Sequence, residues 1–556
     1  MTTAQQRPST DEPNLRRHIG ITGLLFASVG SIIGSGWLFG ALNASQQAGP
    51  AAIISWAIGG VMILLIALVY AELGTMFPLS GGVVRYPHMS FGSFASYTTG
   101  WITWVAVATT APIEVEAALQ YGTQYAPFTT EHTLADGSTV HTLTALGYGV
   151  AVLLMALFVV VNYYGIRWFA RINNALVWWK LAIISLVIVA FFVAAFHGSN
   201  FSAYGFRPEG WHGVFTAIAT SGIVFSYLGF RQGIELAGET DNPRRNVPLA
   251  VIGSVLITGV IYILLQVAFI GALAPSILDK SKGWAGLSYG GDFGPLASLA
   301  SLLGLGWLAV LLYIDAVVSP GDTGLIYTTI TSRISYAMSR NGNAPASLQK
   351  TTSRGVPMVS LIVTFFVGLI VFLPFPSWQQ LVGFITSATV MSFASGPLVL
   401  AALRDQDPDR ERPFRLPGGH VIPVLAFWAS NMIVYWSGWD IVWKLMVAVL
   451  LGFALLGIFM LTGKVQTPHL DLPSGAAWLL PWLGGMTLVS WLGKFPEPYA
   501  GNLGALDFGW SFVVVFALSV AVYWLAYRFR LPAAAAQQHI SGTEAEARVT
   551  EEQLAV

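Results

Sequence analysis

Two interruptions rich in glycine and serine break long apolar segments of this chain. The first reads Val29-Gly30-Ser31-Ile32-Ile33-Gly34-Ser35-Gly36-Trp37, and the second runs from Ser221 to Phe230. Glycine weakens a helix by about 1 kcal/mol relative to alanine, so Gly34 and Gly36 predict local unwinding. The amino end of a half-helix attracts a carboxylate through its N–H groups, and carbonyls freed by unwinding attract an ammonium group. The pair of breaks therefore predicts a site for a zwitterion.

Close helix packing is the alternative explanation, because Gly-x-Gly is also a packing motif. The positions of the breaks favour binding. They lie in the first and sixth apolar spans, which is the spacing of a five-plus-five inverted repeat whose discontinuous helices meet at mid-membrane. In lipid, unwound backbone is tolerated only beside a cavity.

The composition places these segments in a membrane. Hydrophobic residues make up 55% of the 556 residues and charged residues 10%, whereas soluble proteins carry about 25% charged residues. The net charge of +0 argues against a nucleic-acid partner, and the absence of cysteine excludes Cys-ligated metals and thiol catalysis. The 9 histidines include no pair at metal-ligand spacing on a polar helix. The sequence also lacks a phosphate loop, a nucleotide fold and a catalytic triad, so we expect no enzyme, no metal and no cofactor.

Apolar runs long enough to cross a bilayer, about 20 residues each, predict an all-α polytopic membrane protein. Twelve to fourteen spans fit the sequence, and fourteen is the preferred count. The candidate spans lie near residues 20–46, 51–77, 93–126, 143–163, 170–196, 212–239, 248–273, 296–338, 357–374, 378–403, 420–438, 441–463, 475–493 and 507–529.

Basic residues orient these spans, because lysine and arginine favour cytoplasmic loops. With the N-terminus inside, most of the 27 lysines and arginines fall on the inner side. The basic residues in outer loops are Arg207, Lys280, Lys282 and Lys494. We therefore expect both termini to be cytoplasmic and the protein to lie in the cytoplasmic (inner) membrane. The polar residues 1–19 form no cleavable signal peptide, since the next apolar run is too long. The tail from about Pro532 is expected to be disordered or loosely helical.

Several segments, in order from about residue 20 to 360, match a known family. They are Ile32-Ile33-Gly34-Ser35-Gly36, Ala71-Glu72-Leu73-Gly74, Phe77-Pro78-Leu79-Ser80-Gly81-Gly82, Phe225 to Gly229, Asn242-Pro243-Arg244-Arg245-Asn246-Val247-Pro248, and Ser339-Arg340-Asn341-Gly342. Together they resemble the amino acid permeases of the amino acid–polyamine–organocation (APC) superfamily, which have the LeuT-type fold. The resemblance implies a first inverted repeat in residues 20–196 and a second in residues 212–403. About four additional helices in residues 420–530 and a cytoplasmic tail in residues 531–556 would follow.

The resemblance also implies a substrate site. The N–H groups around Ser35 and Gly36 would hold an α-carboxylate, and the carbonyls of Ile32, Phe225 and Ser226 would accept the α-amine. Phe225 would close over the substrate as an aromatic gate, for which ordinary core packing is the alternative. The expected substrate-binding residues are Ile32, Gly34, Ser35, Gly36, Phe225, Ser226, Tyr227, Gly229 and Tyr327.

Charged residues at membrane depth are costly, so each is a functional hypothesis. Lys180 in the fifth span stands where some family members have a lysine, near the sodium site of sodium-coupled relatives. The resemblance implies that its ammonium replaces the cation and that its loss of a proton couples transport to a proton gradient. Snorkelling to an interface or a fixed ion pair is the alternative.

Arg231 departs from the family pattern, because many relatives have glutamate in this region. Its Phe-Arg-Gln context resembles an aspartate–proton symporter-like branch, which implies that Arg231 receives an acidic substrate side chain. The alternative is an ion pair with Glu114 or Glu116 of the third span, which would neutralise both charges in a low dielectric. The two glutamates could equally favour a basic or larger polar substrate.

The resemblance thus implies a secondary active transporter that moves an amino acid by alternating access. Proton-coupled symport and an acidic amino acid are favoured. Its partners would be the amino acid, protons and the lipid bilayer, and it would be a monomer or a homodimer. An amino acid exchanger is the alternative mechanism. A non-transporting sensor fits less well, because the tails carry no recognisable signalling module, and a channel would need a polar stripe along several helices.

Overall fold

The computed structural model describes residues 19–554 except 80, 134–138, 165, 291–292, 341, 343, 353–355, 466–469 and 496–500. Ser80, Asn341 and the expected N-terminal tail up to residue 18 lie outside the described residues. The α-helices are α1 (Ile21–Ile32), α2 (Gly36–Ala48), α3 (Ala52–Met76), α4 (Gly82–Phe91), α5 (Ser93–Ala108), α6 (Thr110–Gly122), α7 (Ala145–Tyr164), α8 (Ile166–Ala194), α9 (Gly210–Thr220), α10 (Gln232–Glu235), α11 (Pro243–Ala272), α12 (Pro275–Lys280), α13 (Pro295–Leu302), α14 (Gly306–Arg340), α15 (Met358–Val371), α16 (Trp378–Phe393), α17 (Ser395–Gln406), α18 (Val421–Trp436), α19 (Trp439–Leu461), α20 (Leu472–Leu492), α21 (Phe508–Arg528) and α22 (Ala533–Leu554). Short 3-10 helices are η1 (Gly49–Ala51), η2 (Gly198–Phe201), η3 (Phe225–Arg231), η4 (Ala237–Glu239) and η5 (Ala346–Gln349).

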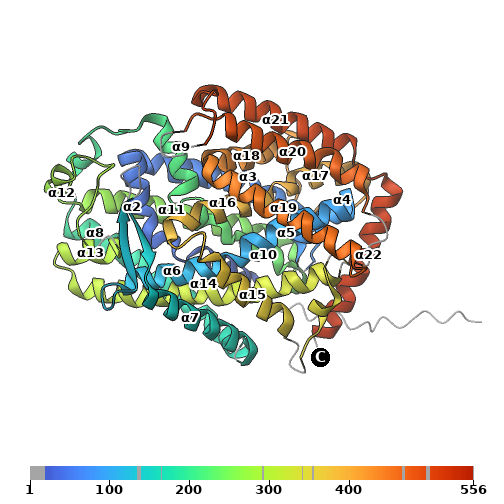
Figure 1. Cartoon of the computed structure of the whole chain (residues 1–556), viewed down its shortest axis with the longest axis horizontal. Helices are drawn as coiled ribbons and strands as arrows, with labels where there is room; N and C mark the ends of the chain where they lie inside the picture. The colour runs from blue at the N-terminus through green and yellow to red at the C-terminus, as the bar shows by residue number, and fades with distance from the viewer. Residues whose placement is uncertain are drawn as a thin grey trace, which may run out of the picture.

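The predicted all-α membrane architecture is confirmed. Among the described residues, ten helical runs are long and apolar enough to cross a membrane, or eleven if one bent pair counts as a span. The shorter apolar helices α1, α15 and α18 also coincide with predicted spans. Most of the long helices run roughly along the long axis of the molecule (Figure 1).

The outer helices present large apolar side chains to the surroundings. Leu153 of α7 is 67% exposed, Val193 of α8 is 81% exposed and Val260 of α11 is 60% exposed. Exposed apolar surface of this extent is stable in contact with lipid but not in contact with water. By contrast, the α16–α17 run is enclosed by other helices along its most apolar stretch. The bundle therefore has a protein-lined interior in which polar groups can be held.

Two helices are interrupted where the glycine and serine runs predict it. α1 ends at Ile32 and α2 begins at Gly36, with bends between them. α9 ends at Thr220, and the segment that continues from Phe225 is bent from it by 45°. Both interruptions can be predicted from the sequence because their cause is local. Small residues weaken the helix and allow other backbone to approach.

Two peripheral features differ from the sequence-based expectation. Residues Thr129–Thr133 (β1) and Thr139–Leu143 (β2) pair as an antiparallel hairpin, although no strand was predicted there. The C-terminal tail forms the helix α22, which lies beside α4 at one end of the molecule (Figure 1). The expectation of a helical tail is confirmed and that of a disordered one is wrong. Docking explains the order, because Gln406 Nε2 donates to the carbonyl of Leu531 at 2.8 Å, just before α22.

Candidate functional site

The two interrupted helices cross at glycines. A Cβ atom on Gly36 would lie 2.1 Å from the Ser226 hydroxyl, and one on Gly229 would lie 2.3 Å from the backbone nitrogen of Ile32. A Cβ atom at Gly229 would therefore collide with backbone, and one at Gly36 would require the Ser226 side chain to move. This close approach brings the amino end of α2 against η3 and α1 against Gly229.

A small cavity lies at this crossing. Its free volume is about 10 Å³, which holds about one water molecule. Five helical segments contribute its walls: α1 with the break that follows it, α6, η3, α14 and α16. The lining residues are Ser31, Ile32, Gly34, Thr110, Glu114, Phe225, Leu228, Thr323, Tyr327, Ile385 and Thr389.

Aromatic side chains pack against one another beside the first break. The indole Nε1 of Trp378, the first residue of α16, donates to the Ser35 hydroxyl at 2.8 Å. Its ring packs edge-on against Phe225, with 6.2 Å between ring centroids, and lies 4.7 Å from the ring of Phe39. Phe225 lines the cavity. Together with Trp378 and Phe39 it forms a cluster that we call the aromatic cover.

Glu114 lies at the amino end of α2. Its Oε2 atom accepts a hydrogen bond of 2.9 Å from the backbone N–H of Ser35, and the side chain is buried. Its Oε1 atom has no hydrogen-bond partner within the described part of the chain. The same Oε1 would be 2.6 Å from a Cβ atom on Gly34, so the carboxylate rests directly on the unwound segment. A carboxylate is favoured at this position, because the amino end of a helix carries partial positive charge.

Lys180 projects from α8 into a fully buried ion pair. Its Nζ atom lies 2.5 Å from Oδ2 of Asp322 on α14. The same ammonium donates to the carbonyl of Gly30 on α1 at 2.9 Å and to the hydroxyl of Thr323 at 3.3 Å. Neither the lysine nor the aspartate side chain is exposed. The pair therefore joins three helices just beside the break in the first span.

Arg231 is buried at the end of η3, and its NH2 atom lies 3.1 Å from Oε1 of Glu235, one turn further on. Among the described residues, Arg231 is thus paired with Glu235, four residues further along the chain, and not with Glu114, which is directed at Ser35, or with Glu116. Within the described residues the Nε and NH1 atoms of Arg231 have no hydrogen-bond partner. A 3-10 helix has three residues per turn, so Phe225, Leu228 and Arg231 share one face. The first two of them line the cavity.

The other expected site residues do not all meet the cavity. Ile32, Gly34, Phe225 and Tyr327 line it, and Ser35 reaches it through its contact with Glu114. Tyr227 packs against Trp56 and Tyr262 and donates to the backbone of Trp56. Glu116 is buried but absent from the lining, and neither of its oxygens has a hydrogen-bond partner among the described residues. The carbonyl of Ile32, expected to accept a substrate amine, accepts from the N–H of Gly34 at 3.1 Å.

Several contributors to the site were not assigned from the sequence. Asp322 and Thr323 follow Pro320 within α14, and an acid inside an apolar span was a signal that could have marked Asp322. Trp378 and the lining residues of α16 carried no such signal, because apolar and hydroxyl side chains are ordinary in a buried helix. Their role depends on which helix faces the first break.

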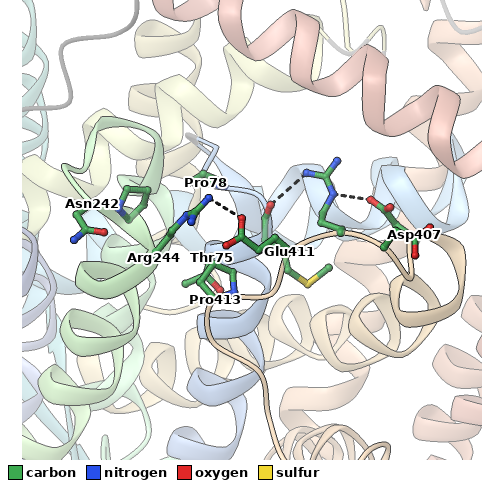
Figure 2. A pocket seen from close by; sticks show the side chains of 11 residues that line it. Thr75, Pro78, Asn242, Arg244, Asp407, Glu411 and Pro413 are labelled. Carbon is green, nitrogen blue, oxygen red and sulfur yellow. Dashed lines mark hydrogen bonds and ion pairs between the residues drawn. The ribbon is translucent and has the colours of Figure 1, made fainter.

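A larger pocket, of about 670 Å³, lies elsewhere, between the end of α3, the start of α11 and the loop after α17 (Figure 2). Four of its five charged lining residues form ion pairs with one another. Arg244 contacts Glu411 at 2.7 Å, and Arg410 contacts Asp407 at 2.6 Å and Glu544 of α22 at 2.9 Å. These pairs tie loops and the C-terminal helix together and offer no complementary charge to a zwitterion.

Comparison with known proteins shows the family to which the chain belongs. A family model for amino acid permeases matches residues 19–488. The glutamate/serine transporter AimA of Bacillus subtilis (strain 168) is 38% identical over 513 residues, which are 92% of this chain and 93% of that protein. The aspartate-proton symporter of the same organism is 36% identical over 529 residues, which are 94% of this chain and 98% of that protein. These matches, together with the many apolar helices, identify a multi-pass membrane transporter. The chain therefore belongs to the amino acid permease family of the APC superfamily.

Proposed function

We propose that this protein is a proton-coupled amino acid symporter of the cytoplasmic membrane, with both termini in the cytoplasm and acidic amino acids among its substrates. Two relatives that align over more than nine-tenths of the chain are a glutamate/serine transporter and an aspartate-proton symporter. The amino acid would bind at the crossing of the interrupted helices, with its side chain extending along η3.

The single observation that carries the coupling proposal is the buried pair of Lys180 and Asp322. A buried ion pair is stable only while both partners are charged, because removing one charge leaves the other uncompensated in a low dielectric. Loss of the lysine proton also removes a charge-assisted hydrogen bond to Gly30, four residues before Gly34. Binding and release of a proton here would therefore alter the contact between α1, α8 and α14.

The same pair suggests how a proton could act on alternating access. Lys180 belongs to residues 20–196 and Asp322 to residues 212–403, the two segments proposed as inverted repeats. The bond from Trp378 to Ser35 also joins these two segments. In this account the repeats rock about the cavity, and the ion pair and the aromatic cover form and break between them. Either a monomer or a homodimer is compatible with such motion.

Arg231 supports an acidic substrate. It continues the cavity-lining face of η3, and two of its guanidinium nitrogen atoms have no hydrogen-bond partner in the described structure. A buried guanidinium is strongly stabilised by a second carboxylate that satisfies these donors. A substrate whose α-amino acid group lies at the break could extend its side-chain carboxylate toward Arg231.

The proposal is tested by tracer uptake into liposomes that contain the purified protein. Aspartate, serine and arginine would each be supplied with and without an inward proton gradient. We expect aspartate to accumulate only with the gradient. Accumulation of arginine instead would contradict the assignment of Arg231, and uptake that requires amino acid preloaded inside would identify an exchanger.

A further inference from the structure

The carboxylate of Glu114 occupies the position at which the carboxylate of an amino acid substrate would bind. The site is the amino end of α2, a helix of 13 residues whose backbone N–H at Ser35 points at Glu114 Oε2. The resemblance to amino acid permeases implies that this N–H group binds the substrate carboxylate. One N–H group cannot be the primary donor to two carboxylates, and two negative charges this close repel strongly in a low dielectric.

Only one of the two carboxylate oxygen atoms of Glu114 is hydrogen-bonded at this position. Its Oε2 atom is satisfied by Ser35, but its Oε1 atom is buried without a hydrogen-bond partner among the described residues. A carboxylate fixed for stability is normally hydrogen-bonded on both oxygens, because a buried unsatisfied oxygen is costly. A carboxylate with one unpaired oxygen atom is easier to displace from its site than one that is hydrogen-bonded on both.

The cavity leads to the same conclusion. Its free volume of about 10 Å³ is far too small for an amino acid, and Glu114 is part of its wall. Rotation of the Glu114 side chain away from Ser35 would vacate both the N–H group and space beside Gly34. The other groups at this end of the helix are less able to move, because Ser35 is held through its hydroxyl by Trp378.

We infer that Glu114 is an internal substitute for the substrate carboxylate: it neutralises the amino end of α2 between transport cycles and is displaced when an amino acid binds. This role rests on the proposed function and defines a specificity-determining residue of that site. Return of Glu114 to Ser35 would then compete with bound substrate and promote its release. The competition concerns the carboxylate common to all amino acids, so it applies to acidic and neutral substrates alike.

The test measures equilibrium binding of radiolabelled aspartate and serine to the purified full-length protein. Glu114→Gln removes the competing charge, and Glu114→Ala also vacates the N–H group. We expect both variants to bind each amino acid about tenfold more tightly than the unmodified protein, the effect of one charge-assisted hydrogen bond. We also expect slower release of bound aspartate from both variants. Glu114→Asp keeps the charge on a shorter side chain and should give an intermediate affinity.

Glu116→Gln is the matched control, because Glu116 is a buried glutamate of the same helix that does not line the cavity. We expect its affinity to equal that of the unmodified protein. Weaker binding by both Glu114→Gln and Glu114→Ala would overturn the inference, since it would mean that Glu114 attracts the substrate ammonium. Unchanged binding by both would overturn it as well. If the unmodified protein bound no amino acid, the proposed function itself would fail, and the two failures are thus distinguishable.

Discussion

Nζ of Lys180 lies 2.5 Å from Oδ2 of Asp322, and both side chains are completely buried between α8 and α14. Removing one partner of such a pair costs about 3–5 kcal/mol, because the remaining charge stays buried without compensation. We therefore expect Lys180→Met and Asp322→Asn each to lower the thermal unfolding temperature of the purified protein. The double variant should unfold at a higher temperature than either single variant. A double variant less stable than both would contradict the assignment of these residues as mutual partners.

Alanine variants of the two glycines at the helix crossing should differ in whether a second substitution restores uptake. A Cβ atom on Gly36 meets the Ser226 hydroxyl, whereas one on Gly229 meets the backbone of Ser31 and Ile32. We expect Gly36→Ala and Gly229→Ala each to reduce uptake at least tenfold, because overpacking of a core costs about 1–3 kcal/mol. Adding Ser226→Gly should restore much of the uptake of Gly36→Ala and none of that of Gly229→Ala. Rescue of both variants would show that the two segments are less closely packed than described here.

Substitution of Arg231 should impair the transport of acidic substrates more than that of neutral ones. Arg231→Gln removes the positive charge while retaining hydrogen-bonding groups, so we expect the KM for aspartate to rise about tenfold or more and that for serine to change little. Arg231→Lys should partly restore aspartate uptake. The matched control is Glu235→Gln, which removes the existing partner of Arg231 and should retain aspartate uptake. Equal losses for serine and aspartate in Arg231→Gln would make Arg231 a purely structural residue.

The docking of the C-terminal helix should weaken in acid. Nε2 of His88 on α4 and Nδ1 of His539 on α22 lie 3.0 Å apart. Burial, together with the neighbouring His539 imidazole, lowers the pKa of His88 to about 4, compared with about 6.5 for an unperturbed histidine. The undocked state therefore takes up a proton at higher pH than the docked state does. Docking is fully favoured above about pH 6.5 and loses stability as the pH falls toward 4.

Amide hydrogen exchange of α22 tests this expectation. After correction for the intrinsic pH dependence of exchange, protection should be lower at pH 5 than at pH 7. The carboxylates that face this region are Asp471, whose Oδ2 atom lies 3.6 Å from Nε2 of His539, and Glu544, whose Oε1 atom lies 2.9 Å from NH1 of Arg410. His88→Gln should remove most of the pH dependence. A pH dependence that persists unchanged in His88→Gln would assign it to another group.

The sequence predicted what depends on local composition, and it missed what depends on distant packing. The breaks after Ile32 and Thr220 were predictable because glycine and serine act within a few residues. Lys180 was recognisable as a lysine in an apolar span, but its partner Asp322 lies on a helix that only the fold brings alongside. Arg231 illustrates the intermediate case. Its i, i+4 neighbour Glu235 was visible, yet only the fold directs Glu114 to Ser35 and leaves Glu235 as the partner.

Two further misses have similar causes. The threonine-rich strands Thr129–Thr133 and Thr139–Leu143 are too short for periodicity to separate them from a loop. The tail helix α22 is polar and would be marginal in isolation, so its order depends on the surface that α4 provides. The pattern of spans, which depends only on lipid as the solvent, was the most predictable part of the structure.

We propose that proton coupling depends on the buried pair of Lys180 and Asp322. The most direct test compares two assays of aspartate transport in liposomes for the unmodified protein and for Lys180→Ala: accumulation driven by an inward proton gradient, and exchange of internal for external aspartate with no gradient. We predict that Lys180→Ala abolishes gradient-driven accumulation while it retains measurable exchange, because the substrate site is intact and only the coupling group is lost. Full gradient-driven accumulation by Lys180→Ala would contradict the account.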